Sequence, residues 1–128
     1  MATKHDDKLS VMVVDDEKDI LTVVMKALEA HGLNVVGYTD PIQALQHFTD
    51  GGDSFNVIVS DVRMRGLTGF QLARKVKEVH PRIKIVLMSS FEITKPELDK
   101  VLPSASVDGF LCKPFKLSKL MQVIASLD

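Results

Sequence analysis

Short runs of apolar, β-branched residues alternate along this chain with segments whose apolar residues recur every three or four positions. The short runs contain few polar residues, which is typical of strands buried on both faces of a parallel sheet. The segments with the helical period are typical of amphipathic helices that cover such a sheet. The pattern therefore predicts an α/β domain in which a strand and a helix alternate five times.

The predicted elements begin with a strand and end with a helix. The strands span residues 10–14, 34–38, 56–61, 83–88 and 109–111. Three helices are predicted over residues 17–30, 70–80 and 117–127. A short helix begins at Pro41, with Asp40 as its N-cap. A weakly predicted helix lies between Pro96 and Pro103. Because crossovers between parallel strands are right-handed, few topologies remain for the sheet.

Length and composition describe one globular domain. The chain has 128 residues, 45% of them hydrophobic and 26% charged, which suffices for a core without a disulfide or a structural metal. The net charge of -1 gives no reason to expect direct nucleic-acid binding. Cys112 is the only cysteine, and no apolar run is long enough to span a membrane, so a cytoplasmic location is expected. Residues 1–8 are expected to form a flexible leader before a domain at 9–128.

Functional side chains stand at the carboxyl ends of four predicted strands, which form the edge where ligands bind in open α/β sheets. Asp15 and Asp16 follow the first strand, Asp61 ends the third, Ser89 follows the fourth, and Lys113 follows the fifth. Three carboxylates at one edge repel one another unless a cation joins them or one of them keeps its proton. Oxygen ligands of this kind favour Mg²⁺, which also binds phosphate oxygens. A carboxylate beside Mg²⁺ and a lysine is suited to attack phosphorus and form an aspartyl phosphate.

Four short motifs surround these residues. They are Val13-Val14-Asp15-Asp16-Glu17, Asp61-Val62-Arg63-Met64 with Gly69 further on, Val86-Leu87-Met88-Ser89-Ser90, and Phe110-Leu111-Cys112-Lys113-Pro114-Phe115. Together they resemble the motifs of response-regulator receiver domains of two-component signalling. The resemblance extends over about residues 10–127 and implies a flavodoxin-like (βα)5 three-layer sandwich with strand order 2-1-3-4-5.

The resemblance implies a phosphoryl acceptor and a metal site. Asp61 is expected to accept the phosphoryl group. Asp15, Asp16 and Asp61 are expected to hold Mg²⁺, directly or through water, and the backbone carbonyl of Arg63 completes the protein ligands.

The resemblance also implies a conformational switch. Lys113 is expected to bind the phosphoryl group, and the Lys113–Pro114 peptide bond is expected to be cis. Ser89 is expected to move toward the phosphoryl group, and Phe110 to swing inward behind it. These movements would alter the face formed by the fourth helix, the fifth strand and the fifth helix.

The implied partners are proteins. A sensor histidine kinase or a histidine phosphotransfer domain would donate the phosphoryl group, and a downstream effector protein or domain would bind the switched face. A phosphorylation-dependent dimer through the same face is compatible with this scheme. The domain would assist its own phosphotransfer and dephosphorylation, but it would not be a conventional turnover enzyme, and no membrane partner is expected.

Two other interpretations stay open. A degenerate receiver would act as a phosphorylation-independent interaction module, although the complete set of acidic, serine and lysine residues argues against it. A Mg²⁺-dependent phosphatase of the haloacid-dehalogenase type would need a second Asp two residues after Asp61, where this chain has Arg63. No glycine-rich phosphate loop follows the first strand either.

Two further features concern Arg65, near the predicted site, and the histidines, away from it. Receiver domains usually carry Pro where this chain has Arg65, which adds a cation near the acceptor. The four histidines show no metal-ligand spacing and are expected to lie on the surface. They are His5, His31, His47 and His80.

Overall fold

The computed structural model describes residues 9–51, 55–90 and 107–127 of the chain. The strands are β1 (Ser10–Val14), β2 (Asn34–Tyr38), β3 (Val57–Asp61), β4 (Lys84–Ser89) and β5 (Gly109–Cys112). The helices are α1 (Lys18–Ala30), α2 (Pro41–Gly51), α3 (Gly69–Val79) and α5 (Leu117–Ala125). These bounds agree with the sequence-based ones to within two residues, and those of β1 and β2 are identical. The expected leader at 1–8 and the expected helix between Pro96 and Pro103 lie outside the described residues.

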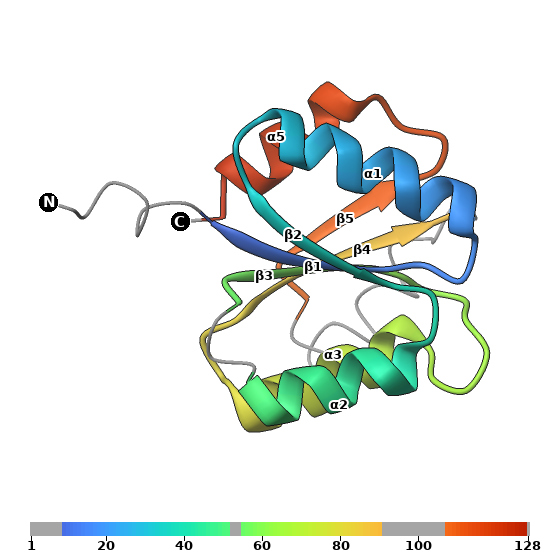
Figure 1. Ribbon diagram of the computed structural model, residues 1–128, viewed down its shortest axis with the longest axis vertical. Coiled ribbons are helices and arrows are strands. Elements are labelled where there is room, and N and C mark those ends of the chain that lie inside the picture. Colours follow the sequence, from blue (N-terminus) through green and yellow to red (C-terminus); the bar gives the residue numbers. More distant parts are fainter. Residues whose placement is uncertain (1–8, 52–54, 91–106, 128) are drawn as a thin grey trace, which may run out of the picture.

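The strands form one parallel sheet in the order β2-β1-β3-β4-β5. Helices α1 and α5 cover one face of this sheet, and α2 and α3 cover the other (Figure 1). The predicted flavodoxin-like three-layer fold with strand order 2-1-3-4-5 is therefore confirmed. None of the helices in the described part of the chain combines the length and the apolar composition that a bilayer span requires.

Two hydrophobic cores lie on the two faces of the sheet, because successive side chains of a strand point in opposite directions. Met12 and Ile58 of the central strands face the core that includes Phe48 and lies beneath α2 and α3. Val13 and Val59 face the core beneath α1 and α5. Both faces of β1 and β3 are thus buried, which explains the unbroken apolar runs in the sequence.

Local signals in the sequence set the starts of two helices. The Asp40 carboxylate accepts a hydrogen bond from the backbone N–H of Ile42 at 2.8 Å, which confirms the predicted N-cap of α2. Thr68 forms a capping box with Gln71 at the start of α3. These caps fix where the loops after β2 and β3 end, and both loops border the carboxyl edge of the sheet.

Of the four histidines expected on the surface, His31 is exposed, His47 and His80 are only partly exposed, and His5 lies outside the described residues. The His47 ring is half-buried between the rings of Tyr38 and Phe55, with centroid distances of 5.5 and 5.4 Å. A hydrogen bond joins His47 Nδ1 to the Tyr38 hydroxyl. His47 directly precedes the buried Phe48 on α2, so the helix brings it against the edge of the core.

Candidate functional site

The carboxyl ends of β1, β3, β4 and β5 meet at one edge of the sheet, because these strands are parallel and paired in sequence register. One carboxylate oxygen from each of Asp15, Asp16 and Asp61 lies within 4.8 Å of the other two. The acidic residues that the sequence places at two separate strand ends are therefore brought together. Their cluster is the acidic site of this protein.

Asp61 is buried at the end of β3, with 7% of its surface exposed. Its Oδ1 accepts a hydrogen bond from the backbone N–H of Val62 at 3.0 Å, which orients the carboxylate. Helix α3 begins at Gly69 directly against this strand end. A Cβ atom at position 69 would lie 2.4 Å from the backbone oxygen of Asp61, so glycine is required for this close approach. The sequence motif includes Gly69 without revealing this reason.

Lys113 supplies the cation of the acidic site. Its Nζ donates a hydrogen bond to Asp15 Oδ2 at 2.8 Å and lies 3.5 Å from Asp61 Oδ1. Asp15 is fully buried, and 9% of the Lys113 side chain is exposed, so this pair is largely shielded from water. Glu17 approaches the same ammonium at 3.8 Å, a contact that sequence reasoning missed. The predicted cis peptide bond between Lys113 and Pro114 is confirmed.

Burial and charge shift the pKa values of two of these groups. Burial raises the pKa of the Asp61 carboxyl; the nearby ammonium of Lys113 opposes this effect, and the charge of Asp15 adds to it, leaving the pKa raised. Burial alone lowers the pKa of Lys113, but its hydrogen bond to Asp15 and the surrounding carboxylates outweigh that effect and raise it. The charged form of Lys113 is thus favoured, while the ionised form of Asp61 is disfavoured.

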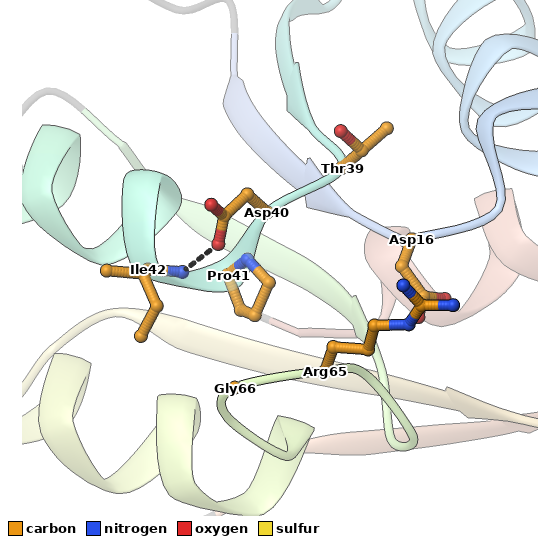
Figure 2. Close-up of a pocket in the computed structure, with 7 residues that line it drawn as sticks. All are labelled: Asp16, Thr39, Asp40, Pro41, Ile42, Arg65 and Gly66. Atoms are coloured by element: carbon orange, nitrogen blue, oxygen red, sulfur yellow. Dashed lines mark hydrogen bonds between the residues drawn. The ribbon is translucent and has the colours of Figure 1, made fainter.

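Asp16 differs from the other two carboxylates because it is exposed. It lines a pocket of about 600 Å³ that also contains Asp40 and Arg65. Figure 2 shows the Arg65 side chain extending along this pocket toward Asp16, while Asp40 turns its carboxylate to Ile42. The expected extra cation is therefore next to the acidic site.

The remaining predicted site residues surround the cluster. Ser89 is buried at the end of β4, and its backbone oxygen accepts a hydrogen bond from the Lys113 N–H at 2.6 Å. Phe110 is half-buried on β5, beside Leu87 of β4, and packs against the core beneath α2 and α3. Arg63 is exposed in the loop after β3. Their roles in metal binding and switching stay predictions.

The donor atoms of the acidic site suit a small divalent cation. One carboxylate oxygen from each of the three aspartates lies within 4.8 Å of the other two, so a single small cation between them could be held by more than one carboxylate. The site offers oxygen and no sulfur or imidazole ligand, which is the set that Mg²⁺ prefers. The residues at this edge therefore fit the metal that the sequence predicts.

This chain is similar to known proteins in sequence and in fold. The family model described as the response regulator receiver domain matches residues 11–125. The sensor kinase CckA of Brucella abortus is 29% identical over 126 residues, which cover 98% of this chain and 13% of CckA. The response regulator receiver protein CpdR of the same organism is 27% identical over 117 residues, which cover 91% of this chain and 94% of CpdR.

A solved structure gives the same result for the fold. The chemotaxis protein CheY4 of Vibrio cholerae superposes with a TM-score of 0.85 at 27% identity, covering 94% of this chain and 99% of CheY4. This chain spans less than a quarter of the length of several curated relatives, including CckA. The family match covers most of the chain and contains every residue of the acidic site. The chain therefore belongs to the response regulator receiver domain family.

Proposed function

We propose that this receiver domain accepts a phosphoryl group on Asp61 from a phosphohistidine donor, with Mg²⁺ bound at the acidic site. The observation that carries this proposal is the arrangement of Asp15, Asp16 and Asp61 within 4.8 Å, with Lys113 bridging the two buried members. The exposed carboxylate of Asp16 adds repulsion to the cluster, so stability alone does not account for it. An exposed anionic edge with Lys113 as its internal cation can bind a metal ion and a phosphoryl group.

The transfer step uses the Asp61 carboxylate as nucleophile. A carboxylate oxygen forms a bond to phosphorus while the phosphorus–nitrogen bond of the donor histidine breaks, and the electron pair stays on the imidazole, which takes a proton from water. Bound Mg²⁺ would supply positive charge to the phosphoryl oxygens, with Asp15, Asp16, Asp61 and the Arg63 carbonyl as its protein ligands. The Val62 N–H holds the carboxylate in place before the donor arrives.

Lys113 and Ser89 would then bind the new phosphoryl group. Phosphorylation adds about -1.5 to -2 charge and three acceptor oxygens at Asp61. The Lys113 ammonium is already 3.5 Å from Asp61 and needs little movement to reach those oxygens. The Ser89 hydroxyl would donate to another oxygen, and Phe110 would fill the space that Ser89 leaves.

This switch requires a free-energy difference that such contacts supply. Moving an equilibrium from 1:99 to 99:1 takes about 5.5 kcal/mol, and hydrogen bonds to charged groups contribute roughly 1.5–3 kcal/mol each. The output would be a change on the face that includes β5 and α5. The proposed partners are a histidine kinase or phosphotransfer domain, and an effector or a second copy that binds this face. The domain would act in the cytoplasm as a switch, without binding nucleic acid itself and without turnover of an external substrate.

The test is phosphorylation by a small donor. The protein is incubated with acetyl phosphate or phosphoramidate and Mg²⁺, and its intact mass is recorded. We expect one added phosphoryl group that is lost on treatment with hydroxylamine, as acyl phosphates are, and that does not form with EDTA. Asp61→Asn should block the addition, whereas the exposed Asp50→Asn should not. A wild-type protein that stays unmodified, although it binds histidine kinases, would instead indicate a phosphorylation-independent interaction module.

A further inference from the structure

Arg65 is the one departure from the family motifs that lies in the wall of a pocket beside the acidic site. Its side chain is exposed and shares the pocket with Asp16. Gly66 follows it with a φ of +92°, a left-handed conformation that turns the loop back over the start of α2. Figure 2 shows the guanidinium at the Asp16 side of the pocket. The loop therefore carries a permanent positive charge to the exposed part of the site.

The acidic site is unevenly neutralised. Asp15 and Asp61 both have the Lys113 ammonium within 4 Å. Asp16 forms no hydrogen bond or ion pair within the described ranges of the chain, and Arg65 forms none there either. The carboxylate that lacks a bound cation thus faces the one arginine that lines its pocket. Neither group is held by another partner, so both are available to a diffusing ion or to each other.

We propose that Arg65 acts as a resident cation that weakens divalent-metal binding at the acidic site, and so sets the Mg²⁺ concentration at which the receiver becomes competent. The inference rests on the proposed function, because it takes Asp16 as a metal ligand. In the metal-free protein, the guanidinium lowers the repulsion that Asp16 feels from its acidic neighbours. When a metal ion binds Asp16, the favourable interaction between Asp16 and the guanidinium is weakened, and the ion is repelled by the positive charge of Arg65.

The size of this effect follows from charge, distance and screening. Arg65 and Asp16 line the same pocket, and the Debye length at 0.1 M salt is about 10 Å, so the repulsion between Arg65 and an ion bound at Asp16 is only partly screened. Arginine keeps its charge at all ordinary pH values, so the effect is present throughout the working range. We expect removal of the charge to tighten Mg²⁺ binding by about three- to tenfold at low salt.

The experiment is an NMR titration of the uniformly ¹⁵N-labelled protein with MgCl₂, which measures the dissociation constant without using phosphorylation. Arg65→Gln should bind Mg²⁺ about three- to tenfold more tightly than the wild type, and Arg65→Lys, which keeps the charge, should match the wild type. Arg82→Gln removes an equal charge at the opposite end of the sheet, before β4, and should leave the constant unchanged. The advantage of Arg65→Gln should shrink in 1 M KCl, where the Debye length is about 3 Å.

The outcomes separate this inference from the proposed function. If the wild type and Arg65→Gln bind Mg²⁺ equally at low salt, Arg65 does not tune the site, while the proposed function stands. If Arg65→Gln binds more tightly but the difference persists unchanged in 1 M KCl, the residue acts through loop structure and the electrostatic inference is wrong. If the wild type shows no Mg²⁺ binding at all, the proposed function fails, and the inference fails with it.

Discussion

The acidic site has an interior half and an exterior half that handle charge in opposite ways. In the interior half, Asp15 and Asp61 are buried and share the Lys113 ammonium. In the exterior half, Asp16 and Arg65 are exposed and line the same pocket, with the guanidinium on the Asp16 side, and neither forms a hydrogen bond or ion pair with another described residue. Burial holds Asp61 and Lys113 in one geometry, whereas the Asp16 carboxylate is open to solvent and ions. The comparison shows that one cluster combines a buried, fixed ion pair with an exposed carboxylate whose surroundings can change.

Loss of the interior cation should have the largest effect. Lys113→Met leaves the buried Asp15 carboxylate without its partner, which typically costs about 3 kcal/mol or more. We expect a decrease of that order in the free energy of unfolding in EDTA, measured by urea denaturation. Added Mg²⁺ should restore part of it by supplying another cation. The exposed Lys119→Met should change stability by less than about 0.5 kcal/mol, and an equal loss in both variants would contradict the assignment of Lys113 to the interior half.

The backbone contact at Gly69 gives the next largest effect. Gly69→Ala would place a Cβ 2.4 Å from the Asp61 backbone oxygen, so α3 or the end of β3 must shift. We expect a destabilisation of about 1–3 kcal/mol and a slower phosphorylation rate, because the acceptor moves with its strand. Gly51→Ala is the matched control, since nothing lies within 4 Å of a Cβ there. If Gly69→Ala reduced stability but left phosphorylation by acetyl phosphate unchanged, the position of the β3 end would not control the rate of phosphorylation.

Neutralising Asp61 should stabilise the metal-free protein modestly. The folded-state pKa of Asp61 is raised above its ordinary 3.8, so this group favours the fold below pH 3.8 and loses that contribution as the pH rises through the folded-state pKa. Asp61→Asn should therefore raise the Tm by a few degrees at pH 7 in EDTA, with the gain disappearing at low pH. Thermal denaturation monitored by circular dichroism measures this. A lower Tm for Asp61→Asn at pH 7 would mean that the Lys113 contact outweighs burial.

The smallest effect should come from Glu17. Its carboxylate lies 3.8 Å from the Lys113 ammonium, but its side chain is 63% exposed. Exposed ion pairs contribute about 0–1 kcal/mol, so Glu17→Gln should change the free energy of unfolding by about 0.5 kcal/mol or less. Urea denaturation of both proteins measures the difference. A loss comparable to that of Lys113→Met would contradict the division of the cluster into two halves.

The fold and the acidic edge follow from local patterns in the sequence. The run that ends at Asp61 is apolar except for the buried Ser60, because both faces of β3 are covered, and the run before Asp15 is apolar for the same reason. Parallel strands with right-handed crossovers bring their carboxyl ends to one edge, so the meeting of the acidic residues is already implied. The exact strand order came from resemblance to a known family.

Features that depend on loop paths and on packing between distant segments could not be predicted. The contact of Glu17 with Lys113 depends on the path of the loop after β1, and the steric need for Gly69 depends on the approach of α3 to β3. His47 has ordinary helical spacing, and only the positions of Tyr38 and Phe55 make it half-buried. The direction of the Arg65 side chain depends on the turn at Gly66, and the hydrophobic periodicity of the sequence does not predict this turn.

The hydrogen bond between Lys113 and Asp15 joins residues 98 positions apart in the chain. Such a contact forms only after β5, the last strand to be synthesised, has joined the sheet. A nascent or partly folded molecule therefore has the carboxylates of Asp15 and Asp61 without the ammonium that bridges them. If Asp61 accepts a phosphoryl group as proposed, such a molecule would lack the lysine that binds this group, so competence would arise only once the sheet is complete.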